Sequence, residues 1–93
     1  MNISLDYDHT YTEDPFAWDL FIELMQSRGH KVYVVTARKR RDTDDDLDKL
    51  ATTSNGLYFT KGRAKVEYCD KKGLDIDVWI DDNAFNLLYD KHK

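Results

Sequence analysis

Short apolar runs alternate along the chain with longer segments in which apolar residues recur every three or four positions. The short runs are rich in β-branched and aromatic side chains, which favour strands. The run at 32–35 is apolar throughout, as in a strand that is covered on both faces. The longer segments have the spacing of amphipathic helices. The pattern predicts strands at residues 2–6, 32–35, 56–59 and 77–80.

The first predicted helix has clear signals at both ends. Asp14 is a good N-cap residue, and Pro15 suits the first helical position because its missing N–H would have no partner there. Gly29 is a residue that commonly ends a helix. Three further helices are predicted at residues 42–51, 64–72 and 84–91.

The alternation of strands and helices predicts an α/β fold, with a parallel sheet, helices on both faces and right-handed crossovers. A chain of 93 residues supports a single domain, residues 1–93, without a separate substrate domain. In such a sheet, ligands bind just beyond the carboxyl ends of the strands. The side chains expected in the core include Trp18, Cys69, Trp79, Phe85, Leu88 and Tyr89.

Composition narrows the class of protein. The net charge of −4 argues against broad affinity for nucleic acid or for an anionic membrane, both of which require a basic surface. Cys69 is the single cysteine, so no internal disulfide can form. No apolar run approaches the roughly 18 residues of a membrane span. We therefore expect a cytoplasmic protein without a membrane partner.

Aspartates follow the first and the last predicted strands. Asp6 and Asp8 come after the first strand, and Asp81 and Asp82 after the last. If these strands are neighbours, up to four carboxylates converge, and two of them about 5 Å apart repel by a few kcal/mol at an effective dielectric of about 20. A cation relieves this repulsion, and oxygen ligands favour Mg²⁺ over Zn²⁺. The pattern predicts a Mg²⁺ site.

Residues able to hold an anion lie at the same predicted edge. Thr36 ends the second strand, and its hydroxyl and N–H can hold a phosphoryl oxygen. Lys65 lies at the start of the third helix, where its ammonium group can neutralise charge on a phosphate. The only basic cluster, residues 38–41, begins two positions after Thr36. Two interpretations of this cluster stay open: contact with a nucleic-acid backbone or remote phosphate, or a solvated loop.

Taken in order, these residues resemble the motifs of the haloacid dehalogenase superfamily of phosphotransferases. The segment Asp6-Tyr7-Asp8-His9-Thr10 matches the first motif, DxDxT, and Val34-Val35-Thr36 matches the second. Lys65 matches the third, and Ile80-Asp81-Asp82 the fourth in its DD form. The resemblance implies a three-layer, Rossmann-like core with strand order 3-2-1-4. The short segment 11–14 leaves no room for a cap after the first motif, so the resemblance is to a minimal, capless member.

The resemblance implies a role for each matching residue. Asp6 would be the nucleophile that becomes an aspartyl phosphate, and Asp8 the acid and base of a phosphatase. Thr36 and Lys65 would hold the transferring phosphoryl group, with Thr10 and Arg38 as further substrate contacts. The Mg²⁺ ligands would be Asp6, the Asp8 carbonyl and Asp82, with Asp81 close by.

Several alternatives stay open. Lys61 could be the motif lysine in place of Lys65, although the helix start favours Lys65. An open, capless site suits a nucleotide, a polynucleotide end or another large phosphorylated substrate, and the chain could be a monomer or a homodimer. A catalytically idle module that binds a phosphorylated partner is the alternative function.

Overall fold

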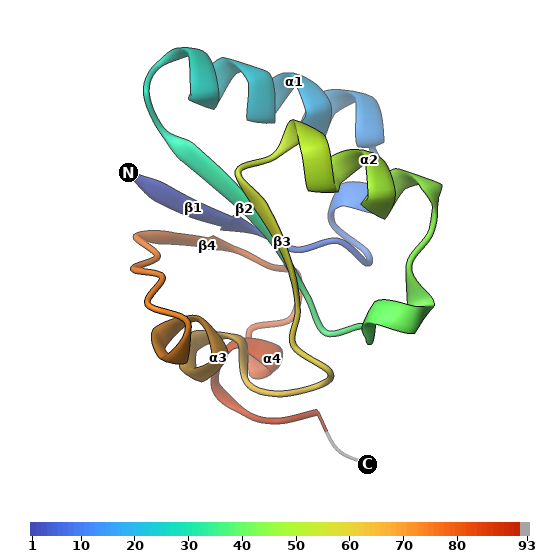
Figure 1. Ribbon diagram of the computed structural model, residues 1–93, viewed down its shortest axis with the longest axis vertical. Coiled ribbons are helices and arrows are strands. Elements are labelled where there is room, and N and C mark those ends of the chain that lie inside the picture. The colour runs from blue at the N-terminus through green and yellow to red at the C-terminus, as the bar shows by residue number, and fades with distance from the viewer. Residues whose placement is uncertain (92–93) are drawn as a thin grey trace.

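The computed structural model describes residues 1–91, which form a four-stranded parallel sheet (Figure 1). The strand order β3-β2-β1-β4 confirms the predicted order, and β1 lies between β2 and β4. The register pairs Leu5 of β1 with Val34 of β2 and with Ile80 of β4. The strands are β1 (Asn2–Leu5), β2 (Lys31–Thr36), β3 (Gly56–Phe59) and β4 (Val78–Ile80).

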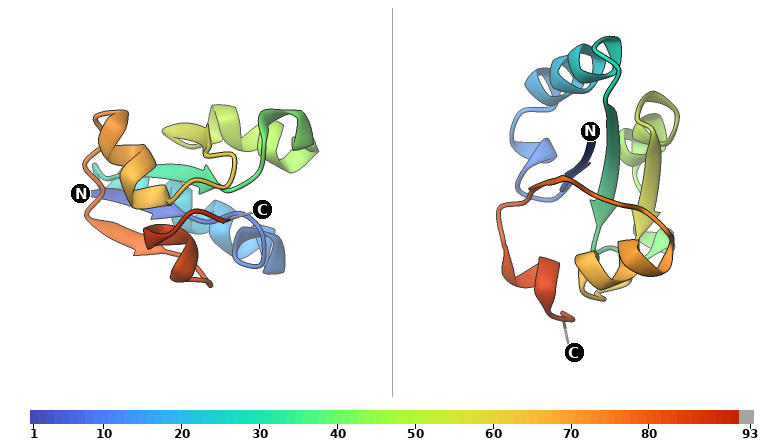
Figure 2. Two further views of the ribbon diagram at one scale, coloured as in Figure 1. Left: turned by 90° about the horizontal axis from the view of Figure 1, so that it is seen from below. Right: turned by 90° about the vertical axis from the view of Figure 1, so that its left-hand side faces the viewer.

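Helices lie on both faces of the sheet, with α1 and α2 on one side and α3 and α4 on the other (Figures 1 and 2). Within residues 1–91, no helix has the length and apolar character needed to cross a membrane. The α-helices are α1 (Pro15–Ser27), α2 (Asp45–Thr53), α3 (Lys65–Lys71) and α4 (Phe85–Leu88), and two 3-10 turns are η1 (Tyr11–Glu13) and η2 (Arg40–Asp42).

Alternate residues of the strands supply two apolar clusters, one on each face. On the α1 and α2 face, Leu5 and Val34 are fully buried. On the α3 face, Val35 packs with Cys69, as predicted for that cysteine. Trp18 and Trp79 were expected in the core and instead lie partly buried at the margins of these clusters. Both faces of the central strands are therefore covered.

Side-chain caps fix where the first two helices begin. The Asp14 carboxylate accepts the N–H of Ala17 at 3.2 Å, and α1 begins at Pro15 as predicted. For α2, the Asp44 carboxylate accepts the N–H of Leu47 at 2.9 Å. The predicted start of this helix at Asp42 is wrong, because the cap lies at Asp44.

The C-terminal segment departs most from prediction. The helix predicted at 84–91 is a single turn, because Tyr89 adopts an extended conformation and ends it. Phe85, Leu88 and Tyr89 were expected to face inward and are instead 56%, 66% and 57% exposed. The rings of Phe85 and Tyr89 stack on each other, with centroids 4.8 Å apart. A helix this short at the margin of the fold cannot bury three large side chains.

Candidate functional site

The carboxyl ends of β1 and β4 bring three aspartates together. The Asp6 N–H donates to the Ile80 carbonyl at 2.9 Å, which extends the pairing of the two strands by one residue. Asp81 and Asp82 follow Ile80 directly. One carboxylate oxygen from each of the three aspartates lies within 4.8 Å of the others. We call Asp6, Asp81 and Asp82 the acidic cluster.

Lys65 bridges two members of the acidic cluster from the first turn of α3. Its Nζ donates to Asp6 Oδ1 at 2.7 Å and to Asp81 Oδ2 at 2.6 Å. The lysine is 1% exposed, so these carboxylates replace its hydration. Lys61, the alternative lysine, is exposed and has a left-handed backbone with φ of 59°. Of these two lysines, Lys65 is the one that the fold places against Asp6.

The acidic cluster has more negative than positive charge, because Lys65 is a single cation paired with two of its three aspartates. Burial raises the pKa of Asp6 to about 7, although the charge of Lys65 acts in the opposite direction. A hydrogen bond with Asp6 lowers the pKa of Asp82. Three carboxylates face one ammonium group, and all the atoms that could coordinate a metal ion here are oxygens. This donor set fits a hard divalent cation such as Mg²⁺.

Thr10 contacts the acidic cluster from the loop after β1. Its Oγ1 lies 3.3 Å from Asp6 Oδ2 and 3.4 Å from Asp82 Oδ1. The loop turns back through His9, whose φ is 65°. A hydroxyl has one proton, so Thr10 can donate to only one of the two carboxylates at a time.

Asp8 and Arg38 form a pair that the sequence did not indicate. The Arg38 guanidinium donates from Nε to Asp8 Oδ2 at 3.0 Å and from Nη2 to Asp8 Oδ1 at 2.8 Å. Its Nη1 contacts the Asp42 carbonyl at 2.7 Å and Asp44 Oδ2 at 3.3 Å. Arg38, predicted as a substrate contact, is thus engaged with acidic groups of its own chain.

Thr36 lies at the end of β2 and is completely buried. Its hydroxyl accepts the N–H of Arg38 at 3.2 Å and therefore turns back on its own chain. The neighbouring residue Ala37, not Thr36, lines the hollow in front of Asp6. The predicted contact between Thr36 and a phosphoryl group stays a prediction.

The hollow in front of Asp6 has a volume of about 340 Å³. Two asparagines and a lysine that the sequence did not single out contribute to its wall. Asn83 and Asn86 follow β4, and two asparagines so soon after the DD motif were the available signal. Lys91 reaches the site from the C-terminal segment, which the sequence could not place. The lining residues are Asp6, Asp8, His9, Ala37, Asp82, Asn83, Asn86 and Lys91.

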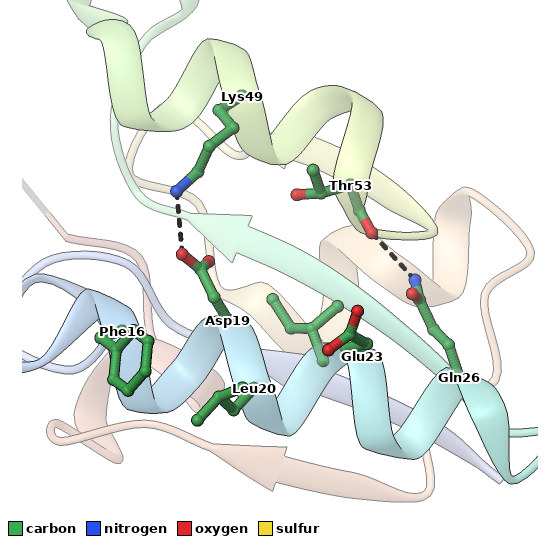
Figure 3. A pocket seen from close by; sticks show the side chains of 8 residues that line it. Phe16, Asp19, Leu20, Glu23, Gln26, Lys49 and Thr53 are labelled. Carbon is green, nitrogen blue, oxygen red and sulfur yellow. Dashed lines mark hydrogen bonds and ion pairs between the residues drawn. The ribbon is translucent and has the colours of Figure 1, made fainter.

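Another hollow, of about 410 Å³, lies between α1 and α2 (Figure 3). Two polar contacts join these helices: Lys49 Nζ to Asp19 Oδ2 at 2.9 Å, and the Gln26 amide to the Thr53 carbonyl at 3.0 Å. No member of the acidic cluster lines it. This hollow is therefore separate from the candidate site at the carboxyl ends of the strands.

Comparisons of the chain with protein-family models, curated proteins and solved structures gave no match.

The acidic cluster predicts that Mg²⁺ binding depends on pH. Because the folded-state pKa of Asp6 is about 7, Mg²⁺ must displace a proton below that pH. We expect the apparent affinity to fall about tenfold for each pH unit below 7 and to level off above it. Calorimetric titration with MgCl₂ at pH 6, 7 and 8 measures this. Equal affinities at pH 6 and 8 would show that Asp6 does not compete for a proton.

Proposed function

We propose that this chain is a Mg²⁺-dependent phosphomonoester hydrolase with a capless, three-layer haloacid dehalogenase core and Asp6 as nucleophile. The observation that carries the proposal is the position of Asp6. Asp6 directly follows β1, one of the two inner strands, and its carboxylate accepts the ammonium of Lys65 and lies within 4.8 Å of an Asp82 carboxylate oxygen. A nucleophilic carboxylate that must approach an anionic phosphate needs positive charge in this position.

Asp6 is fixed from three directions. Its backbone N–H is held by Ile80, one carboxylate oxygen by Lys65, and the other oxygen by the hydroxyl of Thr10. Asp6 lines a hollow that is also lined by Asp8. Fixing the nucleophile in advance lowers the entropic part of the reaction barrier.

The aspartates that would hold Mg²⁺ differ in how many hydrogen bonds and ion pairs their carboxylate oxygens already accept. Asp81 accepts Lys65 through Oδ2 and the N–H of Asn83 through Oδ1. Asp82 is exposed, and its Oδ1 contacts Thr10 at 3.4 Å. We therefore assign Asp82 and Asp6 as direct ligands, with the Asp8 carbonyl, and Asp81 as the residue that positions Lys65. When bound, Mg²⁺ supplies positive charge to the phosphoryl oxygens.

The proposed reaction has two displacements at phosphorus. An Asp6 carboxylate oxygen attacks, the bond from phosphorus to the leaving oxygen breaks, and the Asp8 carboxyl gives that oxygen its proton. Water then attacks phosphorus, Asp8 takes its proton, and the bond to Asp6 breaks. The products are an alcohol and inorganic phosphate. Lys65 stays beside Asp6 throughout and offsets the negative charge of the transferring group.

Before the reaction begins, the Asp8 carboxylate is paired with Arg38. Two guanidinium N–H groups, at 3.0 and 2.8 Å, occupy both oxygens of the Asp8 carboxylate. To protonate the leaving oxygen in the first displacement, Asp8 must leave Arg38 and take up a proton from solvent. Asp44, already 3.3 Å from Nη1, can keep the guanidinium group paired when that happens.

The test measures hydrolysis of p-nitrophenyl phosphate with Mg²⁺ and with EDTA, together with binding of beryllium fluoride, a mimic of a phosphoryl group on a carboxylate. We expect turnover that requires Mg²⁺ and a Mg²⁺-dependent fluoride signal of the bound adduct in ¹⁹F NMR. The adduct does not depend on the choice of substrate. Absence of both turnover and adduct in the folded protein would reject the mechanism, and phosphate binding without them would favour the idle binding module.

A further inference from the structure

A basic groove of about 520 Å³ adjoins the hollow in front of Asp6. The two share Ala37 and Lys91 in their walls, so they lie next to each other. One wall of the groove comes from the segment after β2, and the other from the loop before α3 and the C-terminal segment. The groove is lined by Ala37, Arg38, Lys39, Asp42, Lys61, Gly62, Arg63, Asp90 and Lys91.

The groove concentrates positive charge in a chain whose net charge is −4. Arg38 is occupied by Asp8 and Asp44. Within residues 1–91, the other four cations of the groove form no ion pair, although the chain has 18 acidic residues. Of the two aspartates in the lining, Asp90 is already held by the N–H of Ala64 at 2.8 Å. These four cations are Lys39, Lys61, Arg63 and Lys91.

The backbone holds the groove in shape. Lys61 and Gly62 both have left-handed conformations, with φ of 59° and 83°. The N–H of Gly62 donates to the Ala37 carbonyl at 2.9 Å, which ties the loop after β3 to the end of β2. A Cβ at Gly62 would lie 3.0 Å from the Lys91 carbonyl oxygen, so the C-terminal segment packs directly on this glycine. The walls are therefore preformed rather than assembled by a ligand.

A small phosphomonoester needs only the hollow in front of Asp6 and leaves the four cations of the groove without anions. A polynucleotide strand carries a phosphate on every residue and can neutralise several of them at once. The groove, of about 520 Å³, has room for part of a single strand. We infer that the substrate is a single-stranded polynucleotide with a terminal phosphate, which lies at Asp6 while the adjoining phosphates lie in the groove. This inference rests on the proposed phosphatase function.

A phosphoprotein is the competing substrate class. Its single phosphate would occupy the hollow in front of Asp6, and its flanking residues would need acidic side chains to use the groove. A polynucleotide supplies those charges at every step of its backbone, whatever its sequence. The observations therefore favour the nucleic acid, and an acidic phosphopeptide serves as the competing arm of the test.

The experiment compares kcat/KM for a ten-nucleotide oligothymidylate with a 3′- or 5′-terminal phosphate, for thymidine monophosphate, and for an acidic phosphopeptide. We expect one of the two oligonucleotides to exceed the mononucleotide by at least about tenfold, since each phosphate contact is a charge-assisted hydrogen bond. The ratio of oligonucleotide to mononucleotide kcat/KM is expected to fall about tenfold in Lys61→Glu and in Arg63→Glu. Lys31→Glu, the same charge change at the opposite end of the sheet, leaves the ratio unchanged.

Fluorescence anisotropy of the labelled oligonucleotide with a 3′- or 5′-phosphate gives a readout that needs no turnover. We expect Kd to rise steeply with salt concentration, and the slope of log Kd against log salt concentration to be about 0.7 for each phosphate contacted. Lys61→Glu is expected to reduce that slope. Hydrolysis of the mononucleotide with no preference for either oligonucleotide would overturn the substrate class while leaving the phosphatase intact. Preference for the phosphopeptide would overturn it in favour of a phosphoprotein. Oligonucleotide binding without turnover of any ester would support polynucleotide binding in the groove and contradict the proposed phosphatase function.

Discussion

Asp6→Asn is expected to abolish phosphoester hydrolysis, with kcat reduced by about 10⁴-fold or more, as for loss of a nucleophile. Asparagine keeps the size of the side chain but replaces the carboxylate with a neutral amide, which is a poor nucleophile. Lys65 retains Asp81 as a partner, at 2.6 Å, so the fold is expected to survive. Steady-state hydrolysis of p-nitrophenyl phosphate with saturating Mg²⁺ measures the loss, and thermal unfolding checks that the variant is folded.

The matched control is Asp75→Asn. Asp75 is an exposed aspartate just before β4, at the end of the sheet away from the acidic cluster. The same chemical change there is expected to leave kcat within about twofold, as for other surface substitutions. Asp6→Asn with more than a tenth of the wild-type kcat, in protein checked by mass spectrometry for deamidation, would rule out Asp6 as the nucleophile.

Lys65→Met is expected to lower the free energy of unfolding by about 3 kcal/mol or more at pH 8 without divalent cation. The lysine is almost wholly buried, and its removal leaves Asp6 and Asp81 without their ammonium partner. Without it, the pKa of Asp6 rises beyond its already raised value of about 7. The folded state then binds protons more tightly than the unfolded state, so stability recovers as pH falls from 8 to 5.5. Urea unfolding at the two pH values measures both effects.

Lys71→Met is the control for this change. Lys71 lies in the same helix, is exposed, and pairs with Glu67 at 3.6 Å across one helical turn. Such an exposed pair contributes less than about 1 kcal/mol. Adding Asp6→Asn to Lys65→Met is expected to restore part of the lost stability, because it removes one uncompensated carboxylate. A loss below 1 kcal/mol at pH 8 for Lys65→Met would contradict the assigned charge balance.

The parts of the fold and site that could be predicted are those set by local pattern and by parallel-sheet geometry. Asp14 and Pro15 fixed the start of α1 because both act through the backbone next to them. Asp6 and Asp81 directly follow neighbouring parallel strands, and this alone brings their carboxylates to one edge. The strand order itself came from the resemblance, since alternation gives parallel strands without saying which are adjacent.

The parts that could not be predicted depend on side chains meeting across the fold. The pairing of Arg38 with Asp8 joins residues 30 positions apart and depends on the rotamers of both. Lys91 reaches the site only because the C-terminal segment packs against Gly62. The exposure of Phe85 and Leu88 has a related cause. Their helical spacing is correct, but one helical turn at the margin offers no surface to cover them.

The central position of β1 has a consequence for motion. This strand is hydrogen-bonded on both sides, covered on both faces, and continued by the bond from the Asp6 N–H to Ile80. Amides in such a strand are expected to exchange with deuterium only when the whole domain unfolds, whereas those of the exposed α4 turn exchange through local opening. Asp6, the proposed nucleophile, is thus expected to lie next to the slowest-exchanging part of the chain. Local opening of the α4 turn can then occur while the Asp6 carboxylate keeps its place.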